Sequence, residues 1–329
     1  MMKVKGKTAM AQMQAMEPIS KVVIVGAGRV GSTTAYTMMT RGTAAEIVLI
    51  DADHERAIGE AMDISHGLPF GGTVRVEAGD YSDCAGADIV IISAGVAQKP
   101  GETRIDLVRN NIEVLKEIIP KITAHNQDCI LMMVTNPVDI LTYAMWKISG
   151  FPPNRCLGSG TSLDTARFRY SLGKYFEVAP RSVHAYIIGE HGDTEVPVWS
   201  LANIAGMRLT DFCRATKLCH DDRDLRVIFE NVRDAAYHII QRKGATHYAI
   251  GAAVDAIVGM ILHDQHTVVT VSSLMEGQYG VHDICLSLPT VIGRAGVVRV
   301  LELKLSDAEV EGFRKSAEAL KEVARSVGL

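Results

Sequence analysis

The sequence predicts an α/β protein, with a doubly wound parallel sheet in its first half and an α+β unit with antiparallel strands in its second half. In the first half, short apolar runs closed by Gly, Asp or Asn-Pro alternate with helical stretches. Continuous apolar runs of this kind are typical of strands that are buried on both faces. In the second half, several runs alternate apolar with polar residues, which indicates strands with one wetter face.

Four apolar runs in the first half are the predicted strands of the parallel sheet. They cover residues 21–28, 46–51, 87–95 and 129–137. Helical stretches such as 30–41 and 105–125 lie between them. A regular succession of strand, helix and strand requires right-handed crossovers, so these strands are expected to be parallel.

The second half is predicted to contain four longer strands and several helices. The strands cover 182–190, 267–275, 283–293 and 296–305, and the helices 159–173, 222–243 and 246–262. Gly293 and Gly296 mark a turn between the last two strands. Ser306 and Glu309 form an S-x-x-E capping box, which predicts the start of the last helix.

The composition changes around 150–160, and the domain boundary is placed there. The predicted division is an N-terminal extension over 1–20, a nucleotide-binding domain over 21–160 and a substrate and catalytic domain over 161–329. A chain of 329 residues is long enough for about two domains.

Charge and cysteine content narrow the class of protein. The formal net charge of -4 gives no electrostatic reason to expect nucleic acid or a membrane surface as partner. No apolar run approaches the roughly 20 residues that cross a bilayer. The 6 cysteines are scattered without a C-x-x-C pair, so reduced thiols in a cytoplasmic protein are expected, with no metal site.

The stretch "VVIVGAGRVGS" contains G-x-G-x-x-G at Gly26, Gly28 and Gly31, directly after a predicted strand and before a helix. Such glycines permit a tight turn and a close approach of the backbone to a pyrophosphate at the helix N-terminus. Asp51 ends the next strand, where a carboxylate accepts hydrogen bonds from a ribose diol and repels a 2′-phosphate. The pattern therefore predicts NAD as cofactor rather than NADP.

Two further segments follow strands of the predicted sheet. The loop "SAGVAQKPGETRIDLVRNN" (93–111) carries Arg104, which can close over a substrate and polarise a carbonyl; a solvated charged turn is the alternative. Asn136 in "MVTNPVDI" stands at the carboxyl end of a strand, where ligands bind in such sheets, although Asn-Pro is also a common turn.

Three ionisable residues of the second half form a candidate catalytic set. Asp164 and Arg167 share one face of a probable helix, either as a surface ion pair or as an imidazole partner and a carboxylate clamp. His191, in "AYIIGEHGD", is then either a polar turn residue or a proton-transfer group. By contrast, His263 and His266 lack a third ligand and are interpreted as helix-end polar residues.

These motifs together resemble the L-lactate and malate dehydrogenases. GAGRVG, Asp51, QKPGETR, TNP, LDTARFR, GEHGD and KGAT occur in the order and approximate spacing of that family, from about residue 20 to the end. The resemblance implies a Rossmann-type NAD domain and a substrate domain. It also implies contacts to the cofactor from further residues: Val30, Arg56, Tyr81, Gly95, Val134 and Asn136.

The resemblance also implies the roles of the site residues. His191 would exchange a proton with the substrate oxygen and Asp164 would orient it. Arg167 would bind the substrate carboxylate, Arg104 would polarise the ketone, and Asn136 would bond the substrate. A non-catalytic nucleotide-binding module is the alternative of a different class, and it has no use for this set.

Gln98 and Thr246 decide between substrates within the resemblance. Malate enzymes carry arginine at the position of Gln98 to pair a second carboxylate, whereas Gln98 and Thr246 suit the methyl group of pyruvate. The expected reaction interconverts pyruvate and L-lactate, with a malate enzyme as the alternative. His247 stands where an aromatic residue is more usual.

Two further positions match an effector site of bacterial members of the family. Arg169 and His184 stand where those enzymes bind fructose 1,6-bisphosphate across a subunit interface, with a pair of ordinary polar residues as the alternative. The resemblance therefore implies activation by fructose 1,6-bisphosphate and assembly into a homotetramer.

Overall fold

A computed structural model describes residues 20–97, 101–218 and 222–329 of the chain. Its first half alternates strands and helices in this order: β1 (Lys21–Val25), α1 (Arg29–Arg41), β2 (Glu46–Ile50), α2 (His54–His66), β3 (Arg75–Ala78), β4 (Ile89–Ile92), α3 (Arg104–Thr123), β5 (Ile130–Met133), α4 (Val138–Ser149) and β6 (Cys156–Gly158). The predicted alternation of the first half is confirmed, with β3, α2, α4 and β6 in addition to the segments that the apolar runs indicated.

The second half contains short strands and helices, followed by three longer strands and a final helix. They are α5 (Ser162–Tyr175), β7 (Val183–His184), β8 (Ile187–Ile188), β9 (Val196–Pro197), β10 (Asn203–Ile204), β11 (Met207–Arg208), α6 (Leu209–Thr216), α7 (Asp222–Arg233), α8 (Ala235–Lys243), α9 (Tyr248–Leu262), β12 (Thr267–Glu276), β13 (His282–Gly293), β14 (Gly296–Val300) and α10 (Asp307–Val327). Single 3-10 turns are η1 (Leu68–Phe70), η2 (Tyr81–Cys84), η3 (Pro153–Arg155), η4 (Pro180–Ser182) and η5 (Gln278–Gly280).

Strands from both halves form one sheet. Within the described chain it has nine strands in the order β14-β13-β12-β6-β5-β4-β1-β2-β3. The strands β1 to β6 are parallel and follow the strand order of a doubly wound dinucleotide-binding fold. The chain order reverses between β1 and β4, and ligands bind in such sheets at the carboxyl ends of the strands beside this point.

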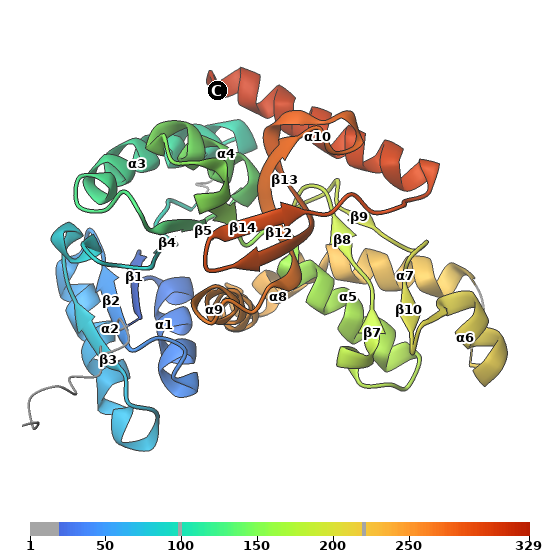
Figure 1. The fold of residues 1–329 in the computed structure, drawn as a ribbon, viewed down its shortest axis with the longest axis horizontal. Helices are drawn as coiled ribbons and strands as arrows, with labels where there is room; N and C mark the ends of the chain where they lie inside the picture. The colour runs from blue at the N-terminus through green and yellow to red at the C-terminus, as the bar shows by residue number, and fades with distance from the viewer. Residues whose placement is uncertain (1–19, 98–100, 219–221) are drawn as a thin grey trace, which may run out of the picture.

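Helices lie on both faces of the sheet (Figure 1). They pack against it through two apolar cores. One core contains Leu115 of α3, Ile140 of α4 and Phe313 of α10. The other contains Ala35 of α1 and Val254 of α9, and α9 lies beside α1. Because apolar partners lie on both faces, β1, β4 and β5 consist almost wholly of buried apolar residues.

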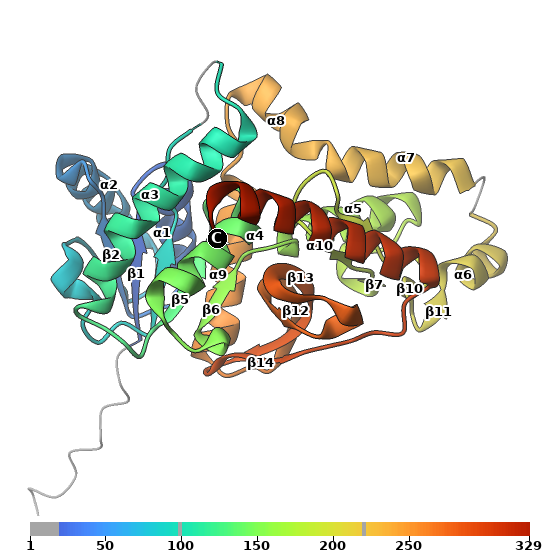
Figure 2. The ribbon, with the colours of Figure 1, turned by 90° about the horizontal axis from the view of Figure 1, so that it is seen from above.

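The antiparallel strands of the second half extend the parallel sheet, which the sequence did not indicate. β12 pairs antiparallel with β6 through Ser272 and Gly158, and β13 and β14 follow it. A third core lies apart from this sheet and is built from α5, β7, β10, α6 and α7 (Figures 1 and 2). Phe168, Phe176 and Val183 are buried in it.

Several boundaries of the second half differ from the prediction. The run 182–190 is divided into β7 and β8, which pair with β10 and β9 respectively. The helix expected over 222–243 is interrupted at Asp234, and the strand expected over 296–305 ends at Val300. The turn from Gly293 to Gly296 is confirmed, as is the capping box in which the Ser306 hydroxyl accepts from the Glu309 amide.

The cysteines differ in part from the expectation of reduced thiols. Cys84, Cys129, Cys156 and Cys285 are free and buried. Cys213 is disulfide-bonded, so the expectation is wrong at that position. The spacing of single cysteines did not indicate this bond because no motif in the sequence paired them.

Candidate active site

Three glycines form the turn between β1 and α1. Two of them have no space for a side chain, and the third faces open space. Gly26 has φ of 107°, and a Cβ atom there would lie 2.7 Å from the Cα of Ala94. At Gly31 a Cβ atom would collide with the carbonyl oxygen of Gly26. At Gly28 it would meet no atom within 4 Å, so this part of the backbone is open to a ligand. The N-terminus of α1 therefore offers an accessible phosphate cradle.

Asp51 fixes this turn from the end of β2. Its Oδ2 accepts a hydrogen bond from the amide of Ala27 at 2.7 Å, and its Oδ1 accepts from the amide of Asp53 at 2.9 Å. A cavity of about 400 Å³ adjoins the Asp51 carboxylate. Six of the predicted cofactor residues line it: Gly26, Gly28, Asp51, Arg56, Tyr81 and Gly95.

Other residues of this cavity were not predicted from the sequence. The Ser93 hydroxyl donates to the carbonyl of Gly26 at 2.8 Å, and the Lys121 ammonium lies 5.3 Å from the centre of the Tyr81 ring. Of the remaining predicted cofactor residues, Val30 is half-buried against the apolar core and Val134 is buried just beyond β5. A glycine turn, a strand-end carboxylate and an adjoining cavity define a dinucleotide-binding α/β protein, and the residues fit the adenosine and pyrophosphate of NAD.

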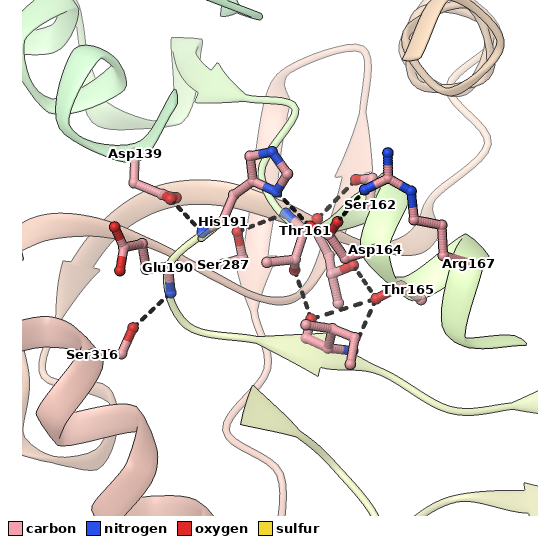
Figure 3. Close-up of polar contacts among 12 residues, drawn as sticks. Asp139, Thr161, Ser162, Asp164, Thr165, Arg167, Glu190, His191, Ser287 and Ser316 are labelled. Atoms are coloured by element: carbon pink, nitrogen blue, oxygen red, sulfur yellow. Dashed lines mark hydrogen bonds and ion pairs between the residues drawn. The ribbon is translucent and has the colours of Figure 1, made fainter. Parts of the chain in front are cut away.

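His191, Asp164 and Arg167 form one hydrogen-bonded cluster (Figure 3). Asp164 lies in the first turn of α5 and His191 in the loop after β8. Asp164 Oδ2 lies 2.5 Å from His191 Nδ1, and Arg167 Nη1 donates to Asp164 Oδ1 at 2.9 Å. The Asp164 side chain is 3% exposed, so this is a buried pair and not the surface ion pair considered as the alternative.

The charges of this cluster favour a protonated imidazole. Burial alone would lower the pKa of His191, but the carboxylates of Asp164, Asp139 and Glu195 outweigh it and raise that pKa to about 9. Burial would likewise raise the pKa of Asp164, yet His191 and Arg167 hold it below its usual value. At neutral pH the cluster therefore holds a cationic ring against an anionic carboxylate.

Glu195 is a buried carboxyl beside this cluster that the sequence did not single out. It is 7% exposed, and no described residue forms a hydrogen bond with its Oε1. Burial, and then the negative charge of Asp164, raise the pKa of Glu195 to about 8. No motif indicates such a group, because its burial depends on packing between segments that are distant in the chain.

Arg104 lies next to the same loop. Its Nη2 donates to Glu190 Oε1 at 2.5 Å, and its Nη1 lies 3.5 Å from Asp193 Oδ2. Thus Arg104 is half-exposed and paired with Glu190 and Asp193, which flank His191. The loop before Arg104 is fixed at its base by Asn111, which is fully buried and bonds both polar groups of the Val96 backbone.

The remaining predicted substrate residues occupy different surroundings. Asn136 is exposed, and a cis peptide bond joins it to Pro137. Thr246 is half-buried in the link between α8 and α9, where the next residue, His247, contacts the Thr33 hydroxyl of α1 at 3.0 Å. Gln98 lies outside the described residues.

The two predicted effector residues lie close together on α5 and β7. Arg169 Nε donates to the Ala185 carbonyl at 3.0 Å, and its guanidinium stacks on Tyr186. His184 is exposed on β7, one residue before Ala185. Arg169 also lines a cavity of about 320 Å³ together with Arg181.

His263 directly follows the last residue of α9, and His266 lies in the link between α9 and β12. His263 Nδ1 contacts the Gly259 carbonyl at 2.9 Å, and His266 Nε2 lies 3.2 Å from Asp264 Oδ1. Over residues 20–97, 101–218 and 222–329, no three His, Cys, Asp or Glu side chains gather in a way that would hold a metal ion. None of the helices in these ranges combines the length and apolar character needed to span a membrane.

Two family models match the chain over most of its length. The lactate/malate dehydrogenase NAD binding domain matches residues 20–158, and the lactate/malate dehydrogenase alpha/beta C-terminal domain matches residues 161–327. The chain thus belongs to the lactate/malate dehydrogenase family, and it is an NAD-dependent oxidoreductase.

Relatives named as L-lactate dehydrogenases are similar over almost the whole chain. An L-lactate dehydrogenase of Acetivibrio thermocellus is 55% identical over 94% of this chain and 98% of its own. L-lactate dehydrogenase 1 of Clostridium acetobutylicum is 49% identical over 95% of this chain and 100% of its own. A crystal structure of a minor L-lactate dehydrogenase from Enterococcus mundtii superposes with a TM-score of 0.92, at 41% identity, covering 94% of this chain and 99% of that one.

Proposed function

We propose that the chain is an L-lactate dehydrogenase, which interconverts pyruvate plus NADH with L-lactate plus NAD. The buried cluster of His191, Asp164 and Arg167 carries this proposal, because it combines one acid/base group with one cation for a substrate carboxylate. The names of the relatives in Acetivibrio thermocellus and Clostridium acetobutylicum support the same substrate.

His191 acts as the proton donor and acceptor in this proposal. Its Nδ1 is engaged by Asp164 Oδ2, so Nε2 is the ring nitrogen left for the substrate oxygen. Bound NADH supplies the hydride for the carbonyl carbon. As negative charge develops on the carbonyl oxygen, protonated His191 donates the Nε2 proton to it, and Asp164 stabilises the charged ring before that step.

Arg167 and Arg104 hold opposite ends of the substrate in the proposed complex. Arg167 still has guanidinium donors beyond its bond to Asp164, and it binds the carboxylate through them. Arg104 is 48% exposed and exchanges its contact with Glu190 for the substrate carbonyl, which it polarises. Asn136 donates a further hydrogen bond beside the nicotinamide, and Val30 and Val134 provide apolar contacts to the cofactor.

Gln98 and Thr246 support pyruvate over oxaloacetate. Neither side chain can neutralise a second carboxylate, and a buried unpaired carboxylate costs several kcal/mol. The test compares kcat/KM of NADH oxidation with pyruvate and with oxaloacetate. A preference for pyruvate is expected. A large preference for oxaloacetate would identify a malate dehydrogenase, and no turnover with either would favour a nucleotide-binding module.

The substitution Gln98→Arg sharpens this test. A guanidinium at the head of the loop would pair a second carboxylate, so preference should move toward oxaloacetate. If the ratio of the two kcat/KM values does not change, Gln98 does not face the substrate.

Fructose 1,6-bisphosphate is proposed as an activator. Arg169 and Arg181 line one cavity, and two cations suit a phosphate group. Burial lowers the pKa of Arg169, so an anion that offsets this cost would be favoured there. Initial rates at low pyruvate, with and without added fructose 1,6-bisphosphate, test the proposal: a lower KM for pyruvate supports activation, and unchanged rates reject it.

A homotetramer is proposed as the assembly. Large apolar side chains are exposed on the described surface, and association would cover them. They include Phe70, Tyr170, Tyr237 and Tyr248. Light scattering of the purified protein tests this, and a stable monomer would contradict it. We also propose a cytoplasmic location, which the buried free thiols of Cys84, Cys129, Cys156 and Cys285 favour, whereas the disulfide at Cys213 opposes it. The proposed division into domains falls at residue 160, just after β6.

A further inference from the structure

Asp139 is a fully buried carboxylate that contacts the backbone of the proposed proton-transfer residue. It lies in the first turn of α4 and is 1% exposed. Its Oδ2 accepts a hydrogen bond from the amide of His191 at 2.7 Å, as Figure 3 shows. Its Oδ1 has no hydrogen-bond partner in the described part of the chain. A buried and half-satisfied carboxylate is costly, so its presence needs an explanation.

The position of Asp139 connects two motifs of the site. Asn136 lies in the loop between β5 and α4, and Asp139 lies in the first turn of α4. One continuous segment thus carries Asn136 at the edge of the sheet and Asp139 against the His191 loop. The N-terminus of α4 favours a negative charge in its first turn. Asp164 approaches the ring from α5, whereas Asp139 approaches the main chain from α4 (Figure 3).

The charge of Asp139 acts on the ring of His191 as well as on its amide. Burial raises the pKa of Asp139 to about 6, against the opposing effect of His191, so the group is ionised at neutral and alkaline pH. Among its neighbours, the hydroxyl of Ser272 lowers this pKa and the negative charge of Glu190 raises it. The ring of His191 faces Asp164, Asp139 and Glu195, and all three favour its protonated form.

We propose that Asp139 is a positioning residue for proton transfer, which fixes the main chain of His191 and supplies a second negative charge that stabilises the protonated ring. This inference rests on the proposed function of His191. It explains why a carboxylate, rather than a neutral acceptor, occupies a buried position beside the His191 amide.

The substitution Asp139→Asn removes the charge and keeps an oxygen that can accept from the His191 amide. In the proposed reaction, pyruvate reduction requires protonated His191, so its kcat/KM falls above the pKa of the ring. This fall is the alkaline limb of the pH profile of kcat/KM. Loss of a negative charge close to the His191 ring should move the alkaline limb to lower pH by about one unit. Asp139→Glu retains the charge and should keep the limb near its original pH, although the longer side chain displaces the loop and lowers kcat.

Asp255→Asn is the matched control. Asp255 is also buried, at 2% exposure, but its partners are Arg41 and Thr43 at the C-terminal end of α1. This variant should leave the pH of the alkaline limb unchanged. A shift of equal size in Asp255→Asn would show that loss of any buried carboxylate produces the effect, and it would reject the proposal.

A second experiment measures the pKa of the His191 ring without requiring catalytic turnover. Diethyl pyrocarbonate modifies neutral imidazole, so the pH dependence of modification at the peptide containing His191, followed by mass spectrometry, reports the pKa of its ring. We expect a lower pKa of His191 in Asp139→Asn than in the protein without this substitution. An unchanged pKa rejects the role of Asp139, whether or not the protein reduces pyruvate. Failure to reduce pyruvate rejects the proposed function, and in that case this titration still tests the role of Asp139.

Discussion

The cofactor cradle and the proton-transfer cluster are built in opposite ways. The cradle comes from one short segment, the β1–α1 turn, with Asp51 from the neighbouring strand. The cradle presents backbone groups and open space to a ligand. The cluster takes Asp164 from α5, His191 from the loop after β8 and Asp139 from α4, and it consists of buried charged side chains.

This difference shows which part of each site is costly. In the cradle, a missing side chain at Gly28 leaves the surface open, and the cost is conformational. In the cluster, each charge is removed from water and is tolerated because an opposite charge or a hydrogen bond compensates it. Substitutions in the cradle should therefore have steric effects, whereas substitutions in the cluster should have electrostatic effects.

The largest effect is expected for His191→Asn. The amide can hold the loop but cannot transfer a proton, so kcat for pyruvate reduction should fall by about 10²- to 10⁴-fold. Binding of NADH, measured by fluorescence titration, should be unchanged because the cradle lies on other segments. Full turnover in this variant would show that the cluster does not carry the proton.

A smaller effect separates two glycines of the cradle. Gly31→Ala places a Cβ against the carbonyl of Gly26, so it should lower the free energy of unfolding by about 1–3 kcal/mol. Gly28→Ala meets no protein atom and should leave thermal unfolding of the cofactor-free protein almost unchanged while it weakens NADH binding. Equal losses of stability in both variants would contradict the assignment of Gly28 to the open face of the cradle.

The sequence predicted the cradle more completely than the cluster, for a physical reason. Gly26, Gly31 and Asp51 act within one strand-turn-helix unit, so local spacing was enough to place them. The spacing of Asp164 and Arg167 predicted a shared helix face, but only the fold shows that the pair is buried and bonded to His191.

Groups whose role depends on distant packing were not predicted. Asp139 and Glu195 are unremarkable in the sequence, and their buried carboxylates become apparent only when α4, α5 and the His191 loop are in place. The same holds for β12, whose attachment to β6 depends on a pairing between residues more than a hundred positions apart. Alternation along β12 predicted a strand but contained no information about its neighbour.

The central claim is that His191 carries the transferred proton and that its neighbours raise the pKa of its ring to about 9 from the ordinary 6.5. The direct test is the pH dependence of kcat/KM in both directions. Pyruvate reduction needs the protonated ring and should fall as pH rises through about 9, and lactate oxidation needs the neutral ring and should rise over the same range. Mirrored limbs near pH 9 are the predicted result; limbs in the same direction, or a transition near 6.5 in both, would contradict it.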